Sequence, residues 1–145
     1  MFALARALRV HITAEQVAAV VRAKLDRAPV VENTLLVDVR STGEVAATGV
    51  IPTAVNIPLK MLEAALDDTV ETDEFTEIFG VAKPKKEVTQ IIFYCAHGVR
   101  SAVAVEIAEG LGFSGARNFS GSFAEWHYRY GGPSSAGDGT ASKAQ

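Results

Sequence analysis

The sequence predicts an α/β fold in which a mostly parallel sheet is covered by helices. Two short and nearly continuous apolar runs, at residues 35–39 and 91–94, have the length and composition of buried parallel strands. Segments whose apolar residues recur at helical spacing lie before, between and after these runs. Strands therefore alternate with helices along the chain, which is the pattern of a layered α/β domain.

Length and composition place these elements in one folded domain. The chain has 145 residues, of which 48% are hydrophobic and 21% charged, and this balance excludes wholesale disorder. We expect an N-terminal segment at residues 1–9, a folded domain at residues 10–132, and a flexible tail at residues 133–145, where small and polar residues predominate.

The charge balance excludes two classes of protein. Fourteen basic and seventeen acidic side chains leave a formal net charge of −3, which argues against a nucleic-acid or membrane-surface binder driven by bulk charge. The sequence also has no apolar run approaching the ~18 residues that a membrane-spanning helix needs. We therefore expect no nucleic-acid partner and no membrane association, and we expect a monomer.

Cys95 is the single cysteine, so the chain has no partner for an intramolecular disulfide and no CxxC pair for structural zinc. This cysteine usage is typical of a reducing compartment, and we expect a cytoplasmic protein. A mitochondrial location is the alternative, because residues 1–9 carry two arginines and no acid. Transit peptides have that charge pattern but are usually longer and richer in serine.

The individual elements follow from apolar spacing and from capping signals. We expect strands at residues 10–12, 35–39, 55–57, 91–94 and 117–119. We expect helices at residues 13–26, 41–49, 59–66, 75–79, 101–111 and 122–130. Three of these helices begin with the residue pair of a capping box, namely Thr13 with Gln16, Ser41 with Glu44, and Ser122 with Glu125.

Cys95 occupies the position where open α/β sheets bind ligands, just after a strand and just before a helix. Gly98 can adopt a positive φ, which lets the backbone curl so that successive N–H groups point inward. The N-terminus of the helix that begins near Ser101 and the charge of Arg100 also favour a thiolate at Cys95. The sequence therefore predicts a nucleophile in a cradle for an anion. The alternative is a small buried core residue, as most lone cysteines are, but a core cysteine needs no basic loop bent by glycine.

Four motifs follow one another along the domain. They are DVRS at residues 38–41 with Glu44, GVIPTAVNIP at 49–58, CAHGVRS at 95–101, and GSFAEW at 121–126. In this order they resemble the rhodanese-like sulfurtransferase family, in particular its single-domain thiosulfate sulfurtransferases. The resemblance implies a three-layer fold with a mostly parallel five-stranded sheet flanked by helices on both faces.

The resemblance also implies a persulfide relay without a metal or organic cofactor. The Cys95 thiolate would take sulfur from thiosulfate or another sulfane-sulfur donor and pass it to cyanide, glutathione or a protein thiol. The substrate-binding loop would comprise Ala96, His97, Gly98, Val99 and Arg100. We expect its backbone N–H groups to stabilise the persulfide and Arg100 to attract the dianionic donor.

Residues around this loop are expected to support it. Ser101 begins the following helix, and Asp38 either orients loop groups beside Cys95 or forms an ion pair. We expect Arg40 to pair with Glu44 and lock the short helix. His97 is interpreted as shaping the pocket, because a lone histidine supplies too few ligands for a metal.

The chain departs from the family at two places. Many relatives have Gly-His-Ile-Pro-Gly-Ala where this chain has GVIPTA at residues 49–54, and the missing histidine is usually structural. The Gly-Gly that usually precedes the last helix is Gly121-Ser122 here, which we expect to lie away from the nucleophile.

Two other functions remain open at this point. A phosphatase or arsenate reductase is one, since the same fold can hold an oxyanion over a cysteine. Tyrosine-type phosphatases, however, use Cys-x5-Arg, and only four residues separate Cys95 from Arg100. The other is a non-catalytic sulfur-carrier or interaction module, which the presence of Cys95 disfavours.

Overall fold

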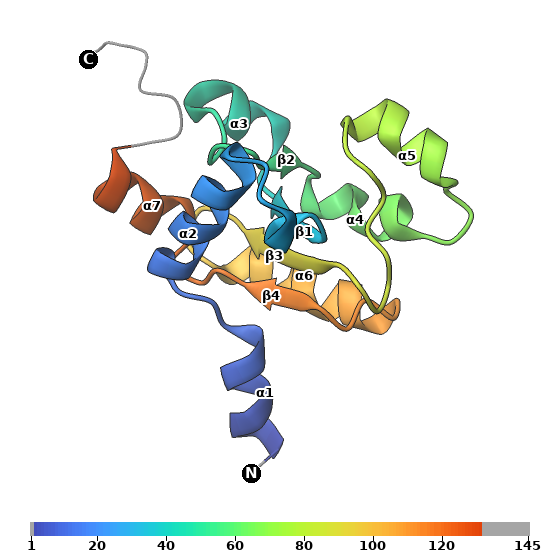
Figure 1. The fold of residues 1–145 in the computed structure, drawn as a ribbon, viewed down its shortest axis with the longest axis horizontal. Coiled ribbons are helices and arrows are strands. Elements are labelled where there is room, and N and C mark those ends of the chain that lie inside the picture. The colour runs from blue at the N-terminus through green and yellow to red at the C-terminus, as the bar shows by residue number, and fades with distance from the viewer. Residues whose placement is uncertain (1, 132–145) are drawn as a thin grey trace.

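The fold is a parallel sheet covered by helices on both faces (Figure 1), seen here in a computed structural model that describes residues 2–131. The strand order is β2-β1-β3-β4, and all three pairings are parallel. The strands are β1 (Thr34–Asp38), β2 (Val55–Asn56), β3 (Gln90–Tyr94) and β4 (Ala116–Asn118). The helices are α1 (Phe2–Val10), α2 (Ala14–Leu25), the 3₁₀ turn η1 (Pro29–Val31), α3 (Thr42–Thr48), α4 (Leu59–Leu66), α5 (Thr72–Phe79), α6 (Val99–Gly110) and α7 (Ser122–Tyr130).

The sheet separates two hydrophobic cores, because successive residues of a strand point to opposite faces. Leu35, Val37, Ile91 and Phe93 pack on one side with buried residues of α4, α5 and α6. The alternate residues of the same strands pack on the other side with α2 and Trp126 of α7. The three-layer α/β architecture expected from the sequence is thereby confirmed.

The sheet has four strands in the described part of the chain, one fewer than expected. The difference lies at residues 10–12, where we expected an edge strand and the structure continues α1 to Val10. Residues 2–10 are dominated by Ala, Leu and Arg, which are strong helix formers. Of the expected strand, His11 alone forms an isolated parallel bridge, to Asn118.

Two helix starts and one helix cap also differ from the expectation. Helix α5 begins at Thr72, three residues before the expected start at residue 75. Helix α6 begins at Val99, so Arg100 belongs to its first turn and not to the preceding loop. The third capping box does not form: Gly121 is the N-cap of α7, and Ser122 adopts φ +58° within the buried interior. The capping boxes of Thr13 with Gln16 and of Ser41 with Glu44 do form. The expected tail at residues 133–145 lies outside the described residues.

Asp38 and Arg40 form a buried ion pair at the carboxyl edge of the sheet. The Arg40 Nη2–Asp38 Oδ2 distance is 2.7 Å, and the two side chains are 3% and 0% exposed. Arg40 also donates to Thr48 Oγ1 and to the Gly49 carbonyl, and its guanidinium lies 4.2 Å from the centre of the Phe123 ring. The ion pair expected between Arg40 and Glu44 is therefore wrong, because the carboxylate two residues before Arg40 takes that place.

Replacing Asp38 by asparagine should destabilise the fold strongly, since it leaves the Arg40 charge buried without its counter-ion. We expect a loss on the order of 3 kcal/mol in the free energy of unfolding, measured by urea titration. Glu15→Gln is the control, because the Glu15–Arg129 pair is exposed and should contribute little. Equal stability of the two variants would contradict a structural role for the buried pair.

Candidate active site

Cys95 follows the last residue of β3 and is only 1% exposed. In the register of the sheet, Tyr94 pairs with Asp38, so the ends of the two central strands meet beside the cysteine. The Cys95 carbonyl accepts a hydrogen bond from the Phe123 N–H at 2.9 Å, and the Ala96 carbonyl accepts one from Ala124 at 3.1 Å. Cys95 is therefore held between the sheet edge and the start of α7.

The loop after Cys95 turns back on the sulfur. Gly98 donates its N–H to Cys95 Sγ at 3.0 Å. Its φ is +95°, a backbone conformation that residues other than glycine rarely adopt. A Cβ atom at this position would lie 2.4 Å from the Ser120 carbonyl oxygen. Both the backbone conformation and the available space therefore require glycine at position 98.

Ser101 supplies a further donor to the sulfur from the first turns of α6. Its side chain is fully buried, and its Oγ lies 3.5 Å from Cys95 Sγ. Burial by itself raises the pKa of the Cys95 thiol. Hydrogen bonds from the Ser101 hydroxyl and from the backbone of Ser101, Gly98 and His97 outweigh it and lower that pKa to about 7.

Replacing Ser101 by alanine should raise the pKa of Cys95, because the thiolate loses a hydroxyl donor while its burial remains. In wild type, the rate of alkylation by iodoacetamide should rise with pH around a midpoint near 7. In Ser101→Ala the midpoint should move upward, and the rate at pH 6.5 should fall several-fold. Ser114→Ala changes an exposed serine and is the control. An unchanged midpoint in Ser101→Ala would show that the hydroxyl does not stabilise the thiolate.

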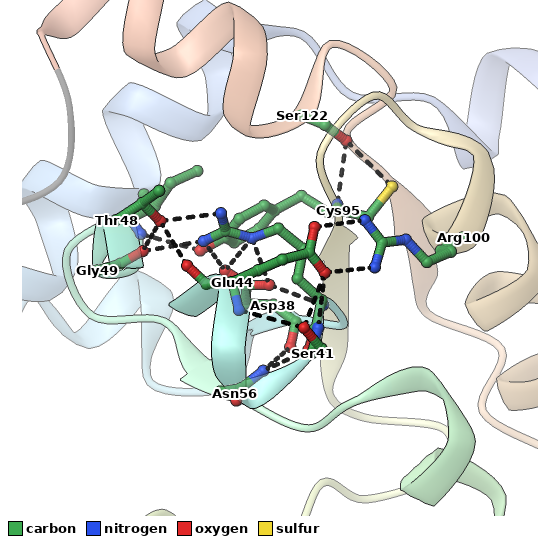
Figure 2. Close-up of polar contacts among 12 residues, drawn as sticks. Asp38, Ser41, Glu44, Thr48, Gly49, Asn56, Cys95, Arg100 and Ser122 are labelled. Carbon is green, nitrogen blue, oxygen red and sulfur yellow. Dashed lines mark hydrogen bonds and ion pairs between the residues drawn. The ribbon is translucent and has the colours of Figure 1, made fainter. Parts of the chain in front are cut away.

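Arg100 is paired with a carboxylate and does not act as an isolated charge over the loop. Its Nη1 and Nη2 donate to Glu44 Oε1 and Oε2 at 2.7 and 2.9 Å (Figure 2). Arg100 therefore has the acidic partner that we had expected Arg40 to take. The two side chains are 37% and 38% exposed, so the pair faces solvent beside the buried cysteine.

Ser122 lies against Cys95, contrary to our expectation that this departure from the family pattern is remote from the nucleophile. Its Oγ accepts the Cys95 N–H at 3.1 Å and lies 3.9 Å from Cys95 Sγ (Figure 2). The same hydroxyl donates to the Phe119 carbonyl at 2.8 Å. The side chain is fully buried. Its hydroxyl therefore satisfies the backbone N–H of the nucleophile itself.

The structure gathers some of the expected site residues around the sulfur and leaves others outside. Gly98, Ser101 and the backbone of His97 contact the thiolate. The His97 side chain is exposed, and Val99 is 75% exposed. Asp38 and Arg40 form their own buried pair on the neighbouring strand.

Sequence reasoning missed two residues, Glu44 as the partner of Arg100 and Ser122 as the partner of Cys95. These contacts join residues 56 and 27 positions apart, so no local spacing indicates them. The one signal for Ser122 is the departure from Gly-Gly itself, because a serine that replaces a glycine places a hydroxyl where the family usually has none.

The described residues offer neither a membrane span nor a metal site. Between residues 2 and 131, no helix combines the length and the apolar character needed to cross a membrane. In the same part of the chain, no three His, Cys, Asp or Glu side chains gather in a way that could hold a metal ion.

The rhodanese-like domain matches residues 17–129 of this chain. The chain therefore belongs to the rhodanese-like domain family. Within that family it is of the single-domain thiosulfate sulfurtransferase type, as its similarity to individual proteins indicates.

Several proteins that are similar in sequence or structure are named sulfurtransferases. Human thiosulfate:glutathione sulfurtransferase is 44% identical over 91 residues, which are 63% of this chain and 76% of the relative. The structure of the human single domain sulfurtransferase TSTD1 has a TM-score of 0.70 at 34% identity, covering 82% of this chain and 96% of that one. The structure of the Saccharomyces cerevisiae single domain sulfurtransferase RDL2 has a TM-score of 0.67, also at 34% identity, covering 84% and 91%.

Proposed function

We propose that this protein transfers sulfane sulfur from thiosulfate to a thiol acceptor through a persulfide on Cys95. The observation that carries the proposal is the geometry around the sulfur, where the Gly98 N–H and the Ser101 Oγ lie 3.0 and 3.5 Å from Cys95 Sγ. These hydrogen bonds lower the pKa of the buried thiol to about 7. A substantial fraction of Cys95 is then thiolate at neutral pH, and the thiolate is the nucleophile.

The reaction divides one sulfur transfer into two displacements at sulfur. The Cys95 thiolate attacks the outer sulfur of thiosulfate, a sulfur–sulfur bond forms, and sulfite leaves with the electron pair of the bond that breaks. Cys95 then holds the outer sulfur as an anionic persulfide. An acceptor thiolate attacks that sulfur, takes it as its own persulfide, and releases Cys95 as the thiolate.

The donors that surround Cys95 suit this chemistry because the negative charge stays near one place throughout. The Gly98 N–H and the Ser101 hydroxyl face the thiolate before the reaction. The same loop backbone, from residues 96 to 100, is proposed to hold the outer sulfur of the persulfide. Preorganised donors stabilise a charge in this way without the cost of reorienting water.

Several finer assignments belong to the proposal. Glutathione is the proposed physiological acceptor, since it appears in the name of the human relative, and cyanide serves as an assay acceptor. We propose a monomer in the cytoplasm, with the mitochondrion as the alternative location, because relatives from two yeasts are named mitochondrial. Size-exclusion chromatography and subcellular fractionation of cells expressing the full chain test these two assignments.

Cys95→Ser should abolish sulfur transfer and leave the fold intact, since serine is nearly isosteric with cysteine and cannot carry sulfane sulfur. The first measurement is the intact mass after incubation with thiosulfate, where wild type should gain one sulfur atom and Cys95→Ser none. The second is thiocyanate production with cyanide as acceptor. Thiocyanate production by a folded Cys95→Ser variant at a rate near wild type would contradict the proposal.

A phosphatase activity is the second candidate, and one similar structure bears on it. A Rhodopseudomonas palustris protein described as a possible tyrosine phosphatase has a TM-score of 0.64 at 26% identity, covering 89% of this chain and 86% of that one. In the present chain, four residues separate Cys95 from Arg100, and the Gly98 N–H already lies 3.0 Å from the sulfur. A ring of donors closed this tightly leaves little room for three phosphoryl oxygens.

Wild type should therefore hydrolyse p-nitrophenyl phosphate negligibly while it transfers sulfur from thiosulfate. Insertion of one glycine between Gly98 and Val99 enlarges the loop, so it should reduce sulfur transfer. Both activities are measured on both proteins. Robust phosphatase turnover by wild type, without persulfide formation, would overturn the sulfurtransferase assignment.

A further inference from the structure

The charge presented beside Cys95 is that of an ion pair and not that of a lone arginine. Arg100 donates through both terminal nitrogens to the two carboxylate oxygens of Glu44, and this fork-to-fork geometry is the strong arrangement for such a pair. The opposite charges largely cancel for any ion that approaches from solvent. Arg100 by itself would attract a dianion, but the pair attracts it much less.

Arg100 nevertheless lies close to the sulfur, because it stands in the first turn of α6, directly after the loop whose Gly98 N–H donates to Cys95 Sγ. The hydrogen bonds that Arg100 donates to Glu44 are the main cause that raises the pKa of Arg100, and the charge of the Cys95 thiolate raises it further. The guanidinium therefore interacts electrostatically with both the Glu44 carboxylate and the Cys95 thiolate. Any change in the Glu44 charge alters the electrostatic potential that an incoming sulfur donor meets.

Glu44 is held in place independently of Arg100. Its Oε1 accepts hydrogen bonds from the Ser41 N–H at 3.0 Å and from the Ser41 hydroxyl at 3.1 Å, as part of the capping box of α3. The hydrogen bonds from Arg100 and Ser41 hold the pKa of Glu44 at about 2, so the carboxylate stays ionised at neutral pH. The negative charge is thus a permanent feature of the solvent-facing pair beside Cys95.

We propose that Glu44 is a specificity-determining residue that neutralises Arg100 and so limits the preference of Cys95 for anionic reactants over neutral ones. The effect on sulfur donors and products rests on the proposed function, whereas the effect on the reactivity of Cys95 does not. Thiosulfate enters as a dianion, and the displacement releases sulfite as a dianion. A free Arg100 would hold both more tightly, so neutralisation weakens donor capture and speeds product release.

The test separates charge from structure with the substitution Glu44→Gln. Glutamine still completes a capping box, and its amide oxygen still accepts from Arg100, but the negative charge is gone. Cys95 is alkylated in parallel with iodoacetate, which is anionic, and with iodoacetamide, which is neutral. Both reagents consume the same thiolate, so the ratio of their rate constants cancels any change in the pKa of Cys95.

The ratio of iodoacetate to iodoacetamide rate constants should rise about two- to fivefold in Glu44→Gln at low salt, and the gain should shrink as ionic strength increases. The change in kcat/KM for thiosulfate should be larger, because the donor carries two charges. Inhibition by added sulfite should strengthen in the same variant. Arg100→Gln should lower the alkylation ratio.

Glu109→Gln is the matched control. Glu109 pairs with Arg6 and Arg9 and lies on α6, nine residues after Arg100, or about 13 Å along the helix axis. Its substitution removes the same charge at a greater distance from Arg100 and Cys95, so it should change the alkylation ratio much less than Glu44→Gln does.

An unchanged ratio in Glu44→Gln would overturn the inference. A fall in the ratio would overturn it as well, because it would mean that Glu44 serves to hold Arg100 in place for anions. The proposed function is tested separately, by persulfide formation in wild type. If wild type forms no persulfide while the alkylation ratio still rises in Glu44→Gln, sulfur transfer is refuted and the electrostatic role of Glu44 is supported.

Discussion

The buried pair of Asp38 and Arg40 connects the elements that surround the nucleophile. Asp38 ends β1, and its backbone carbonyl accepts from Ile57 and from the side chain of Asn56, which joins it to β2. Arg40 reaches from the same strand end to α3 and stacks on Phe123 of α7. Burying two charges is costly unless each is satisfied, and here the guanidinium has a carboxylate, a hydroxyl, a carbonyl and an aromatic ring. The edge of the sheet is thereby held at the place where Cys95 emerges.

The two arginines near the site have opposite surroundings and different tasks. Arg40 is buried and its charge is balanced by Asp38, so it holds neighbouring elements together. Arg100 is half-exposed and its charge is balanced at the surface, so it contributes to the electrostatic potential that reactants meet. The thiolate lies between these surroundings, and its low pKa results from a few short hydrogen bonds that outweigh the effect of burial.

Features that depend on neighbouring residues could be predicted from the sequence. The capping boxes at Thr13 and Ser41, the buried strands and the position of Cys95 after β3 all follow from spacing over a few residues. The same local reasoning failed at Ser122, because a capping pattern takes no account of the tertiary contact between Ser122 and Cys95. It also placed Glu44 with Arg40, four residues away in sequence, when the stronger partner was 56 residues away.

The fold at the N-terminus shows a related limit. Val10 and Ile12 are buried and have the composition of a strand, yet helix propensity over the preceding residues carries α1 to Val10. One bridge at His11 remains of the expected pairing. A short strand at a sheet edge gains few hydrogen bonds, so competition from an adjoining helix decides its length.

The backbone conformation of Ser122 is strained, but its hydroxyl offsets the strain by accepting the Cys95 N–H. A φ of +58° is unfavourable for serine by roughly 1 kcal/mol and is accessible to glycine at no steric cost. Yet glycine would leave the Cys95 amide without its hydroxyl partner in the buried interior, and an unsatisfied buried N–H costs about 1–3 kcal/mol. That cost is at least as large as the strain, so stability and the support of Cys95 favour the same residue. Directed evolution of this scaffold should accordingly hold position 122 constant.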